Sequence, residues 1–260
     1  MRSSDERAAG QLGYREYVGN ADHMAVYSRY QRKYAATIRE SDRVLLDMVR
    51  KTAAAIGAGR RLSLLDIGCS TGNLLLHLKN APGLRLDLAG WDIVPSIIAE
   101  CRANSDLAGI EFAEMNMIEF GNARRFDIVV ANASLMFFDP AEFARAIASI
   151  AAVVLPGGCF LAFDLFHPFE QEVAIVETSR RFPHGLKFYF RGYGTVRAAL
   201  ERAGLAEPHF TPFSIPIDLP RPADLSDITS YTVRAVDREG MSFRGSIYQP
   251  WCHLRARRPA

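Results

Sequence analysis

The sequence lacks the features that mark membrane, secreted and metal-binding proteins. No stretch approaches the roughly 18 consecutive apolar residues that a membrane-spanning helix needs. The polar, charged segment 1–7 has no apolar core of the kind found in secretion signals. The four cysteines form no Cys-X-X-Cys pair, and no group of Asp and His residues has metal-ligand spacing. These absences predict a cytoplasmic protein with reduced cysteines, no membrane contact and no metal.

A large excess of one charge is also missing. The chain carries 31 basic and 29 acidic residues among 260, a net charge of +2. Such a balance gives no support for a nucleic acid as an obligatory partner, and we expect a small-molecule substrate. Apolar residues make up 49% of the chain, which is enough for one substantial core.

Apolar runs and helical patterns alternate through the middle of the chain. Ser41 is expected to cap a helix that Gly57 ends, and Asp139-Pro140 is expected to open another. Further helices are expected at Gly72–Asn80 and Pro95–Ala103. The expected strands are Leu62–Ile67, Leu84–Trp91, Ile110–Ala113, Phe126–Ala131 and Cys159–Leu165. This alternation predicts an α/β fold with a doubly wound, mostly parallel sheet.

The last third of the chain changes character. A helix at Val196–Ala203 and a strand at His209–Ile217 are expected first. The segment Thr229–Tyr248 then predicts a β-hairpin, and Trp251–Arg257 a final strand, which gives seven strands besides the hairpin. Residues 1–10 are expected to be disordered. We predict one domain over 1–260, with an N-terminal tail and helical cover at 1–40, a core at 41–210, and a substrate-side hairpin insertion and final strand at 211–260.

The segment 64–76 carries the most informative pattern. An apolar run ends in Asp66, a loop of small residues with Gly68 and Gly72 follows, and a helical pattern begins. Such a loop lets the backbone approach a ligand and aims the first N–H groups of a helix at it. Asp92 ends the next apolar run. These features predict a nucleoside-containing cofactor across the carboxyl ends of parallel strands.

With these residues in place, the chain resembles the class I S-adenosylmethionine-dependent methyltransferases over about residues 40–210 plus the last strand. The segments that carry the resemblance are Leu65–Gly72, Gly90–Ile93, Glu114–Met117, Phe126–Asn132 and Leu155–Gly158. The resemblance implies a Rossmann-like methyltransferase fold, S-adenosyl-L-methionine as cofactor and S-adenosyl-L-homocysteine as product.

The resemblance also implies roles for cofactor-binding residues. Asp66 stabilises the ammonium group of the methionyl portion, and Asp92 accepts hydrogen bonds from both ribose hydroxyls, for which an acceptor-only carboxylate is suited. The other cofactor-binding positions are the loop residues Gly68, Cys69, Ser70 and Gly72, the adenine contacts Ile93, Asn116 and Met117, and Asn132 at the end of the fourth strand.

Several of these positions have simpler explanations. Asp66 can instead cap the loop, Asp92 can be an ordinary strand-end acid, and Cys69 can be a buried filler. Asn116 stands where many family members have Asp, and it can serve a turn. Ser70 stands where glycine is common, and it is tolerated if its φ stays negative.

Candidate groups for the methyl acceptor come from two regions. His167 follows the fifth strand, and we expect it to be a general base or substrate ligand, with a structural loop histidine as the alternative. Tyr27, Tyr30 and Tyr34 are expected to close over cofactor and substrate, with packing of the cover as the alternative. Arg39 is within the same region and suits a carboxylate, although it is equally a surface residue.

The pattern separates this chain from other enzymes of similar fold. The run Gly68–Asn73 lacks the Gly-X-Gly-X-X-Gly of dehydrogenases, and no Gly-Lys-Ser/Thr of a P-loop follows Gly72. The segment Asn132–Leu135 lacks the Asn-Pro-Pro-Tyr that is usual in methyltransferases of base amines and glutamine amides.

The acceptor is the least determined part. A histidine at the fifth strand and the absence of an acidic cluster favour O-methylation of a metabolite hydroxyl or carboxyl. The alternatives are an N-methyltransferase of a small amine and a non-catalytic S-adenosylmethionine-binding partner subunit. The aromatic segments 188–190 and 210–213, together with the expected hairpin, are expected to shape a substrate pocket or a homodimer interface.

Overall fold

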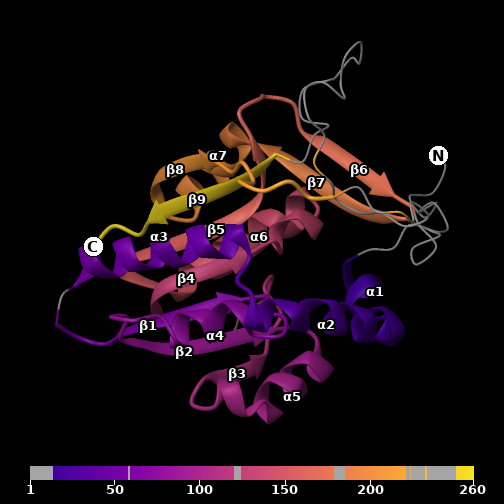
Figure 1. Ribbon diagram of the computed structural model, residues 1–260. Coiled ribbons are helices and arrows are strands. Elements are labelled where there is room, and N and C mark those ends of the chain that lie inside the picture. The colour runs from indigo at the N-terminus through magenta and orange to yellow at the C-terminus, as the bar shows by residue number, and fades with distance from the viewer. Residues whose placement is uncertain are drawn as a thin grey trace.

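The computed structural model describes residues 14–57, 59–119, 124–178, 185–220 and 250–260, together with Ala223 and Thr232. Within these residues, one nine-stranded sheet forms the centre of the molecule, and helices cover both of its faces (Figure 1). The expected hairpin at 229–248 and the expected disorder of residues 1–10 lie outside the described residues. No described helix combines the length and the hydrophobicity that crossing a membrane would require.

Five parallel strands form the core of the sheet, in the order β3-β2-β1-β4-β5. They are β1 (Leu62–Ile67), β2 (Leu86–Asp92), β3 (Glu111–Glu114), β4 (Phe126–Asn132) and β5 (Val154–His167). The reversal of strand order between β1 and β4 confirms the doubly wound, mostly parallel fold. It also places the carboxyl ends of β1, β2 and β4 at one edge, where such folds bind ligands.

Two hydrophobic clusters attach helices to the two faces of the sheet. Helices α3 (Glu40–Ile56), α4 (Asn73–Lys79) and α5 (Pro95–Ala103) share one cluster. Helices α6 (Pro140–Val153) and α7 (Tyr193–Arg202) share the other. The short helix α1 (Tyr14–Gly19) and the longer α2 (Ala21–Ala36) precede α3, and the 3₁₀ turns η1 (Ser105–Leu107) and η2 (Leu135–Phe137) lie in loops.

The helix starts test two expectations. Asp139 caps α6 in a reciprocal capping box with Glu142, as its position before Pro140 predicts. The expectation for Ser41 is wrong. Helix α3 begins at Glu40, the N-cap position is Arg39, and Ser41 lies inside the first turn.

The antiparallel part of the sheet contains the largest departure from expectation. Strand β9 (Trp251–Arg257) has the expected bounds and pairs with β5 and with β8 (Ala206–Pro212), which ends five residues earlier than expected. A further hairpin, β6 (Val173–Glu177) with β7 (Leu186–Gly192), joins the end of β5. The sheet therefore has these two strands in addition to the expected seven.

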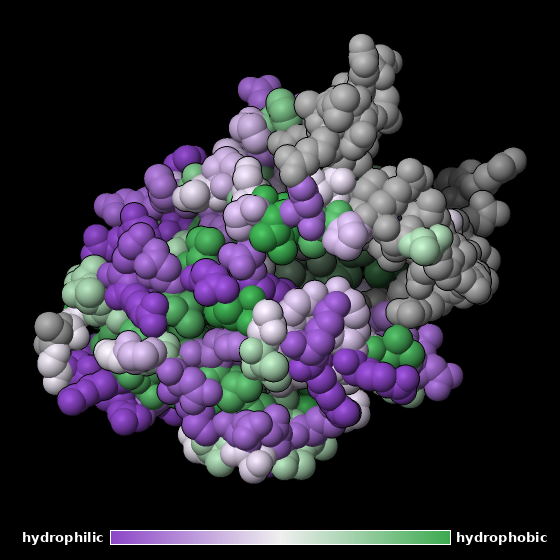
Figure 2. Space-filling view, in the orientation of Figure 1, coloured by the Kyte–Doolittle hydropathy of each residue, from purple (hydrophilic) through white to green (hydrophobic). Residues whose placement is uncertain are grey.

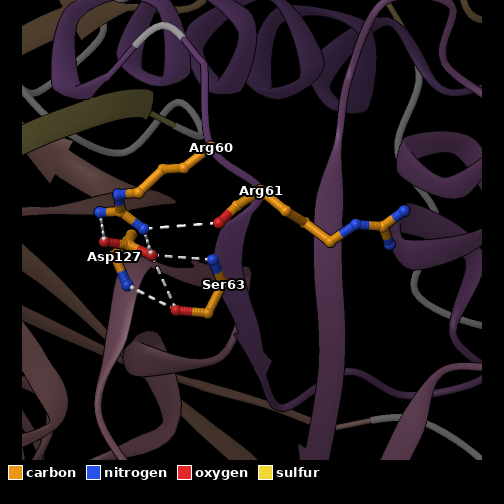
Figure 3. Close-up of polar contacts among 4 residues, drawn as sticks. All are labelled: Arg60, Arg61, Ser63 and Asp127. Atoms are coloured by element: carbon orange, nitrogen blue, oxygen red, sulfur yellow. Dashed lines mark hydrogen bonds and ion pairs between the residues drawn. The ribbon is translucent and has the colours of Figure 1, made fainter.

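A polar network holds the opposite, amino edge of the core together (Figure 3). The carboxylate of Asp127 in β4 accepts hydrogen bonds from the Ser63 backbone N–H (2.8 Å), the Ser63 hydroxyl (2.9 Å) and the Arg60 guanidinium. Burial opposes ionisation of Asp127, but the hydrogen bonds from Arg60 and Ser63 outweigh it and lower the pKa. This network joins β1 to β4, and so supports the register that aligns their carboxyl ends.

Candidate functional site

A cavity of about 470 Å³ lies at the carboxyl edge of the parallel strands. Its walls come from α1, α2, the first turn of α3, the loops after β1, β2 and β4, and β7. Figure 2 shows a hydrophobic recess between the regions that Figure 1 labels β7 and α2. The lining residues used below are Tyr14, Val18, Tyr27, Arg39, Asp42, Asp66, Gly68, Cys69, Ser70, Asp92, Val94, Ile97, Asn132, Ser134, Phe137, Leu186 and Phe188.

The loop between β1 and α4 forms the floor of this cavity. Gly68 has φ +72°, and a side chain there would lie 3.1 Å from the Ser134 Cβ, so glycine is required for close packing. Ser70 has φ +49°, so the condition of a negative φ, under which serine was expected to be tolerated here, is not met. A non-glycine residue in this region is strained, and such residues concentrate at functional sites. Gly72 has φ +75° as the N-cap of α4 and faces Leu107, not the cavity.

Asp92 at the end of β2 fixes the loop and faces the cavity. Its Oδ2 accepts a hydrogen bond from the Ser70 N–H and its Oδ1 accepts one from the Val94 N–H, each at 3.0 Å. Burial raises the pKa of Asp92, and these backbone hydrogen bonds oppose the rise. A carboxylate has about four acceptor positions, so these backbone hydrogen bonds leave acceptor capacity for a ligand.

Two more carboxylates line the cavity beside Asp92. Asp66 at the end of β1 is only 2% exposed, and burial together with the charges of Asp42 and Asp92 raises its pKa well above the usual range. Asp42 accepts a hydrogen bond from Asn132 Nδ2 at 2.9 Å, and burial raises its pKa against the opposing effects of Arg39 and Asn132. Three carboxylates held in one buried site favour a positively charged ligand group.

This acidic cluster contradicts the expectation that the chain has none. The sequence shows Asp42 only as a first-turn helix residue, 24 positions before Asp66. The helix start brings it to Asn132 at the end of β4, which lies next to β1 in the sheet. No local pattern could have identified Asp42, because the contact depends on how α3 packs on the sheet.

Helix α2 covers part of the cavity, as its tyrosines suggested. The Tyr27 ring lines the cavity, and burial raises the pKa of its hydroxyl while hydrogen bonds to Ser70 and Gln31 oppose the rise. Tyr30 also lines the cavity but is 52% exposed, and its hydroxyl is 3.2 Å from that of Tyr34, which lies outside the lining. Arg39 lies over the Tyr34 ring at 3.9 Å and donates a hydrogen bond to the Gln31 side chain.

The expected adenine residues lie next to the cavity but not in its lining. Asn116 Oδ1 accepts a hydrogen bond from the Ile118 N–H at 3.2 Å, which is the geometry of a turn. Ile93 and Met117 are likewise absent from the described lining, where Val94 and Ile97 provide the apolar surface beside Asp92. Cys69 is buried in the lining, and its hydrogen bond with Cys101 and its burial raise its pKa well above the usual range, which favours a packing role.

His167 is not brought to the cavity. It ends β5 at the expected edge, but there it pairs with Gly192 of β7 and its side chain is 0% exposed. Burial lowers its pKa, opposed by the Phe190 backbone and the Glu172 charge. The β6–β7 hairpin, whose strand β7 pairs with β5 at His167, was not predicted from the sequence.

The same hairpin supplies an apolar wall of the cavity. Leu186 and Phe188 of β7 lie beside Phe137 of η2 and Val18 of α1. The aromatic segment 188–190 was expected to shape a substrate pocket or a homodimer interface, and the structure places Phe188 in the cavity lining. The sequence did not identify Leu186, Phe137 or Val18 as its neighbours.

Two buried side chains of opposite charge, Asp164 and Arg191, hold η2 in place behind this wall. Asp164 Oδ2 accepts a hydrogen bond from the Leu135 N–H at 2.7 Å, while Arg191 donates to the carbonyls of Leu135 (3.2 Å) and Phe138. Burial raises the pKa of Asp164 to about 6, against the backbone hydrogen bonds and the charge of Arg191. Among the described residues, no group of three or more His, Cys, Asp or Glu side chains has the arrangement of a metal site.

The central part of the chain is similar to known proteins. Residues 64–158 match the model of a methyltransferase domain. A malonyl-[acyl-carrier protein] O-methyltransferase of Acetivibrio thermocellus is 29% identical over 179 residues, a match that covers 65% of this chain. The match spans 57% of that relative, so the chain corresponds to little more than half of its length.

Solved structures show the same architecture. The N-methyltransferase NodS from Bradyrhizobium japonicum, in complex with S-adenosyl-L-homocysteine, has a TM-score of 0.51 and 17% identity, over 86% of this chain and 90% of that one. An O-methyltransferase family protein from Burkholderia thailandensis has a TM-score of 0.55 and 17% identity, and the match covers 95% of this chain and 63% of that one. These likenesses confirm the expected Rossmann-like fold.

Proposed function

We propose that this chain is a class I S-adenosylmethionine-dependent methyltransferase that transfers a methyl group to a small molecule, and the methyltransferase-domain match over residues 64–158 supports this. The cofactor and the acceptor meet in the cavity at the carboxyl edge of the sheet. The observation that carries this proposal is the buried carboxylate cluster of Asp42, Asp66 and Asp92 in that cavity.

The residues present fit the cofactor. Oδ1 of Asp66 and the hydroxyls of Thr71 and Ser134 are buried in the lining without a hydrogen-bond partner in the protein. Buried polar atoms are normally satisfied, so atoms left open in a cavity indicate a polar ligand. The ammonium group of the cofactor would satisfy Asp66, since it is a cation with several donors.

The chain's own groups then divide the work. Asp66, with Asp42 behind it, holds the ammonium, and the free acceptor positions of Asp92 take the ribose hydroxyls. The backbone at Gly68 approaches the methionyl portion. When bound, S-adenosylmethionine supplies a methyl group on a sulfonium sulfur, which leaves as a thioether after in-line attack by the acceptor. The protein aligns that attack and excludes water.

Contact with adenine remains a prediction from the resemblance for Ile93, Asn116 and Met117. Val94 and Ile97 provide apolar lining beside Asp92, which supports a site there for the adenine base. Cofactor binding likewise remains a prediction for Cys69, Ser70, Gly72 and Asn132. Substrate binding remains a prediction for Tyr27, Tyr30 and Tyr34. The cytoplasmic location, the homodimer and the division of the chain at residues 40 and 210 are also predictions from the sequence.

For the acceptor atom, the sequence favoured a hydroxyl or carboxyl oxygen, and this stays a prediction whose two grounds, His167 at the site and the lack of an acidic cluster, find no support in the structure. The base role of His167 finds no support in its position, because it lies outside the described lining. A small amine is the other candidate. The acidic cluster favours it, because carboxylates attract a cationic acceptor, and an amine can lose its proton to water without a protein base.

The test begins with isothermal titration of S-adenosylmethionine, S-adenosylhomocysteine and NADH, side by side. Binding of the two sulfur compounds without NADH supports the proposal, and binding of NADH alone would overturn it. Release of S-adenosylhomocysteine with hydroxyl and amine acceptors then separates an enzyme from a binding subunit. Tight binding with no turnover of any acceptor favours the non-catalytic partner.

A further inference from the structure

We propose that the acceptor is an aromatic molecule without a carboxylate, and that its ring lies against the wall formed by Tyr14, Val18, Phe137, Leu186 and Phe188. We call these five residues the apolar wall. The inference rests on the proposed function, because it names the substrate class of the same site.

The apolar wall gathers residues from three distant parts of the chain. Tyr14 and Val18 come from α1, Phe137 from η2, and Leu186 and Phe188 from β7. The ring centroids of Phe137 and Phe188 are 5.4 Å apart, and those of Tyr14 and Phe137 are 6.0 Å apart. These separations are typical of interacting aromatic pairs, so the wall is a continuous surface of rings.

The direction of the β7 side chains explains why this wall carries no charge. Successive side chains of a strand point to opposite faces, so Leu186 and Phe188 share one face. Lys187 lies between them, and its Nζ is 5.0 Å from the ring of Tyr189, on the other face. None of the five wall residues is an Asp, Glu, Lys, Arg or His, and all belong to the described cavity lining.

Part of the wall lies on a hairpin that the expected strands did not include. The β6–β7 hairpin is additional to the seven strands that the resemblance implies, and η2 follows β4. Asp164 and Arg191 each hydrogen-bond to the backbone of Leu135 in η2, so Phe137 is held in position before a ligand arrives. A preorganised surface built on an added element is suited to selecting an acceptor.

Charge in the cavity argues against a carboxylate acceptor. Asp42, Asp66 and Asp92 line the same cavity, and Arg39 is the one cation in the described lining. Arg39 already donates to Gln31 and lies over the Tyr34 ring. A second carboxylate, in addition to that of the cofactor, would be desolvated in a cavity with three acids and one engaged cation, which is costly without a dedicated partner.

Size favours a small acceptor. The cavity of about 470 Å³ lies in the range of sites for one drug-sized ligand, and it must hold the cofactor as well. A ring on aromatic residues gains from edge and offset stacking in addition to burial, which a saturated ring of similar size does not. The shape and chemistry of the wall therefore favour an aromatic body.

The experiment uses the full chain saturated with S-adenosylhomocysteine and measures binding of two matched pairs of probes by isothermal titration. Benzylamine and cyclohexylmethylamine share an amine and differ in ring saturation. 2-Naphthol and 2-naphthoate share a ring system and differ in the carboxylate. We expect benzylamine to bind about three- to tenfold more tightly than its saturated partner, and 2-naphthol at least about tenfold more tightly than 2-naphthoate.

Variants locate the effect. Phe188→Ala should weaken benzylamine binding about tenfold and leave the affinity for S-adenosylhomocysteine unchanged. Phe188→Leu keeps an apolar side chain and should remove the preference for the aromatic amine. Phe169→Ala is the matched control, because Phe169 is an exposed phenylalanine outside the cavity lining.

The possible results are distinct. Equal or tighter binding of the saturated or carboxylate probes, no effect of either Phe188 variant, or no binding of any probe to a protein that binds S-adenosylhomocysteine would each overturn this inference. Failure to bind S-adenosylhomocysteine would instead overturn the proposed function.

Discussion

Replacing Asp92 with alanine tests the cofactor site most directly. The Asp92 carboxylate uses one acceptor position for the Ser70 N–H and one for the Val94 N–H, both at 3.0 Å. The remaining positions are available for two ribose hydroxyls. Each hydrogen bond to a charged group is worth about 1.5–3 kcal/mol. Loss of one such bond should therefore weaken S-adenosylhomocysteine binding at least about tenfold, and loss of both more than about a hundredfold.

The assay is isothermal titration of Asp92→Ala beside Asp87→Ala. Asp87 lies on the same strand but near its other end, where it pairs on the surface with Arg61 at 3.2 Å, so its removal should leave the affinity unchanged. Asp92→Ala also frees the Ser70 and Val94 N–H groups, so a thermal melt of each variant shows whether the protein remains folded. A folded Asp92→Ala variant that binds within threefold of the wild type would refute the ribose assignment.

Three further predictions concern the same architecture. Gly72→Ala should lower the free energy of unfolding by about 2–4 kcal/mol, because the φ of Gly72 is +75° and the added Cβ would lie 2.8 Å from Leu107. Gly83→Ala is the control and should lower it by only about 1–2 kcal/mol, because Gly83 has φ +81° but open space around its Cβ position. Equal losses of stability in urea denaturation would contradict this prediction. The pKa of Asp164 is raised from 3.8 to about 6 in the folded state, so its contribution to stability is fully present below pH 3.8 and is lost as the pH rises through 6. Wild-type stability relative to Asp164→Asn should thus fall by about 2 kcal/mol between pH 4 and pH 7, and parallel curves would show that the raised pKa is wrong. Burial and neighbouring charges raise the pKa of Asp66, so binding of a cationic ligand should release protons and become tighter as the pH rises. The heat of S-adenosylhomocysteine binding should therefore differ between phosphate and Tris buffers. Identical heats in the two buffers would exclude this coupling.

The sequence was a good guide where the signal is local. The pattern around Asp66, Gly68 and Gly72 predicted strand, loop and helix, and the structure has β1, a loop with positive φ at both glycines, and α4. Asp66 and Asp92 were both expected at the carboxyl edge, because parallel strands of a doubly wound sheet place their carboxyl ends together. The bounds of β9 were predicted to the residue.

Other features of the site depend on contacts between distant segments. Asp42 joins Asp66 and Asn132 only because α3 packs across β4 and β5. His167 was excluded from the cavity because β7 pairs with the end of β5 and buries it. The sign of φ at Ser70 was also decided in three dimensions, where the Ser70 N–H donates to Asp92.

The amino-acid sequence by itself determined the class of fold, the succession of core strands and helices along the chain, and the two acids at the ends of β1 and β2, because these follow from hydrophobic periodicity and from short-range turn chemistry. Only the tertiary structure decided which side chains share the cavity: the third carboxylate of Asp42, the apolar wall on β7 and the removal of His167. The physical reason is that side-chain direction and helix packing are set by long-range burial, which leaves no period or motif in the local sequence.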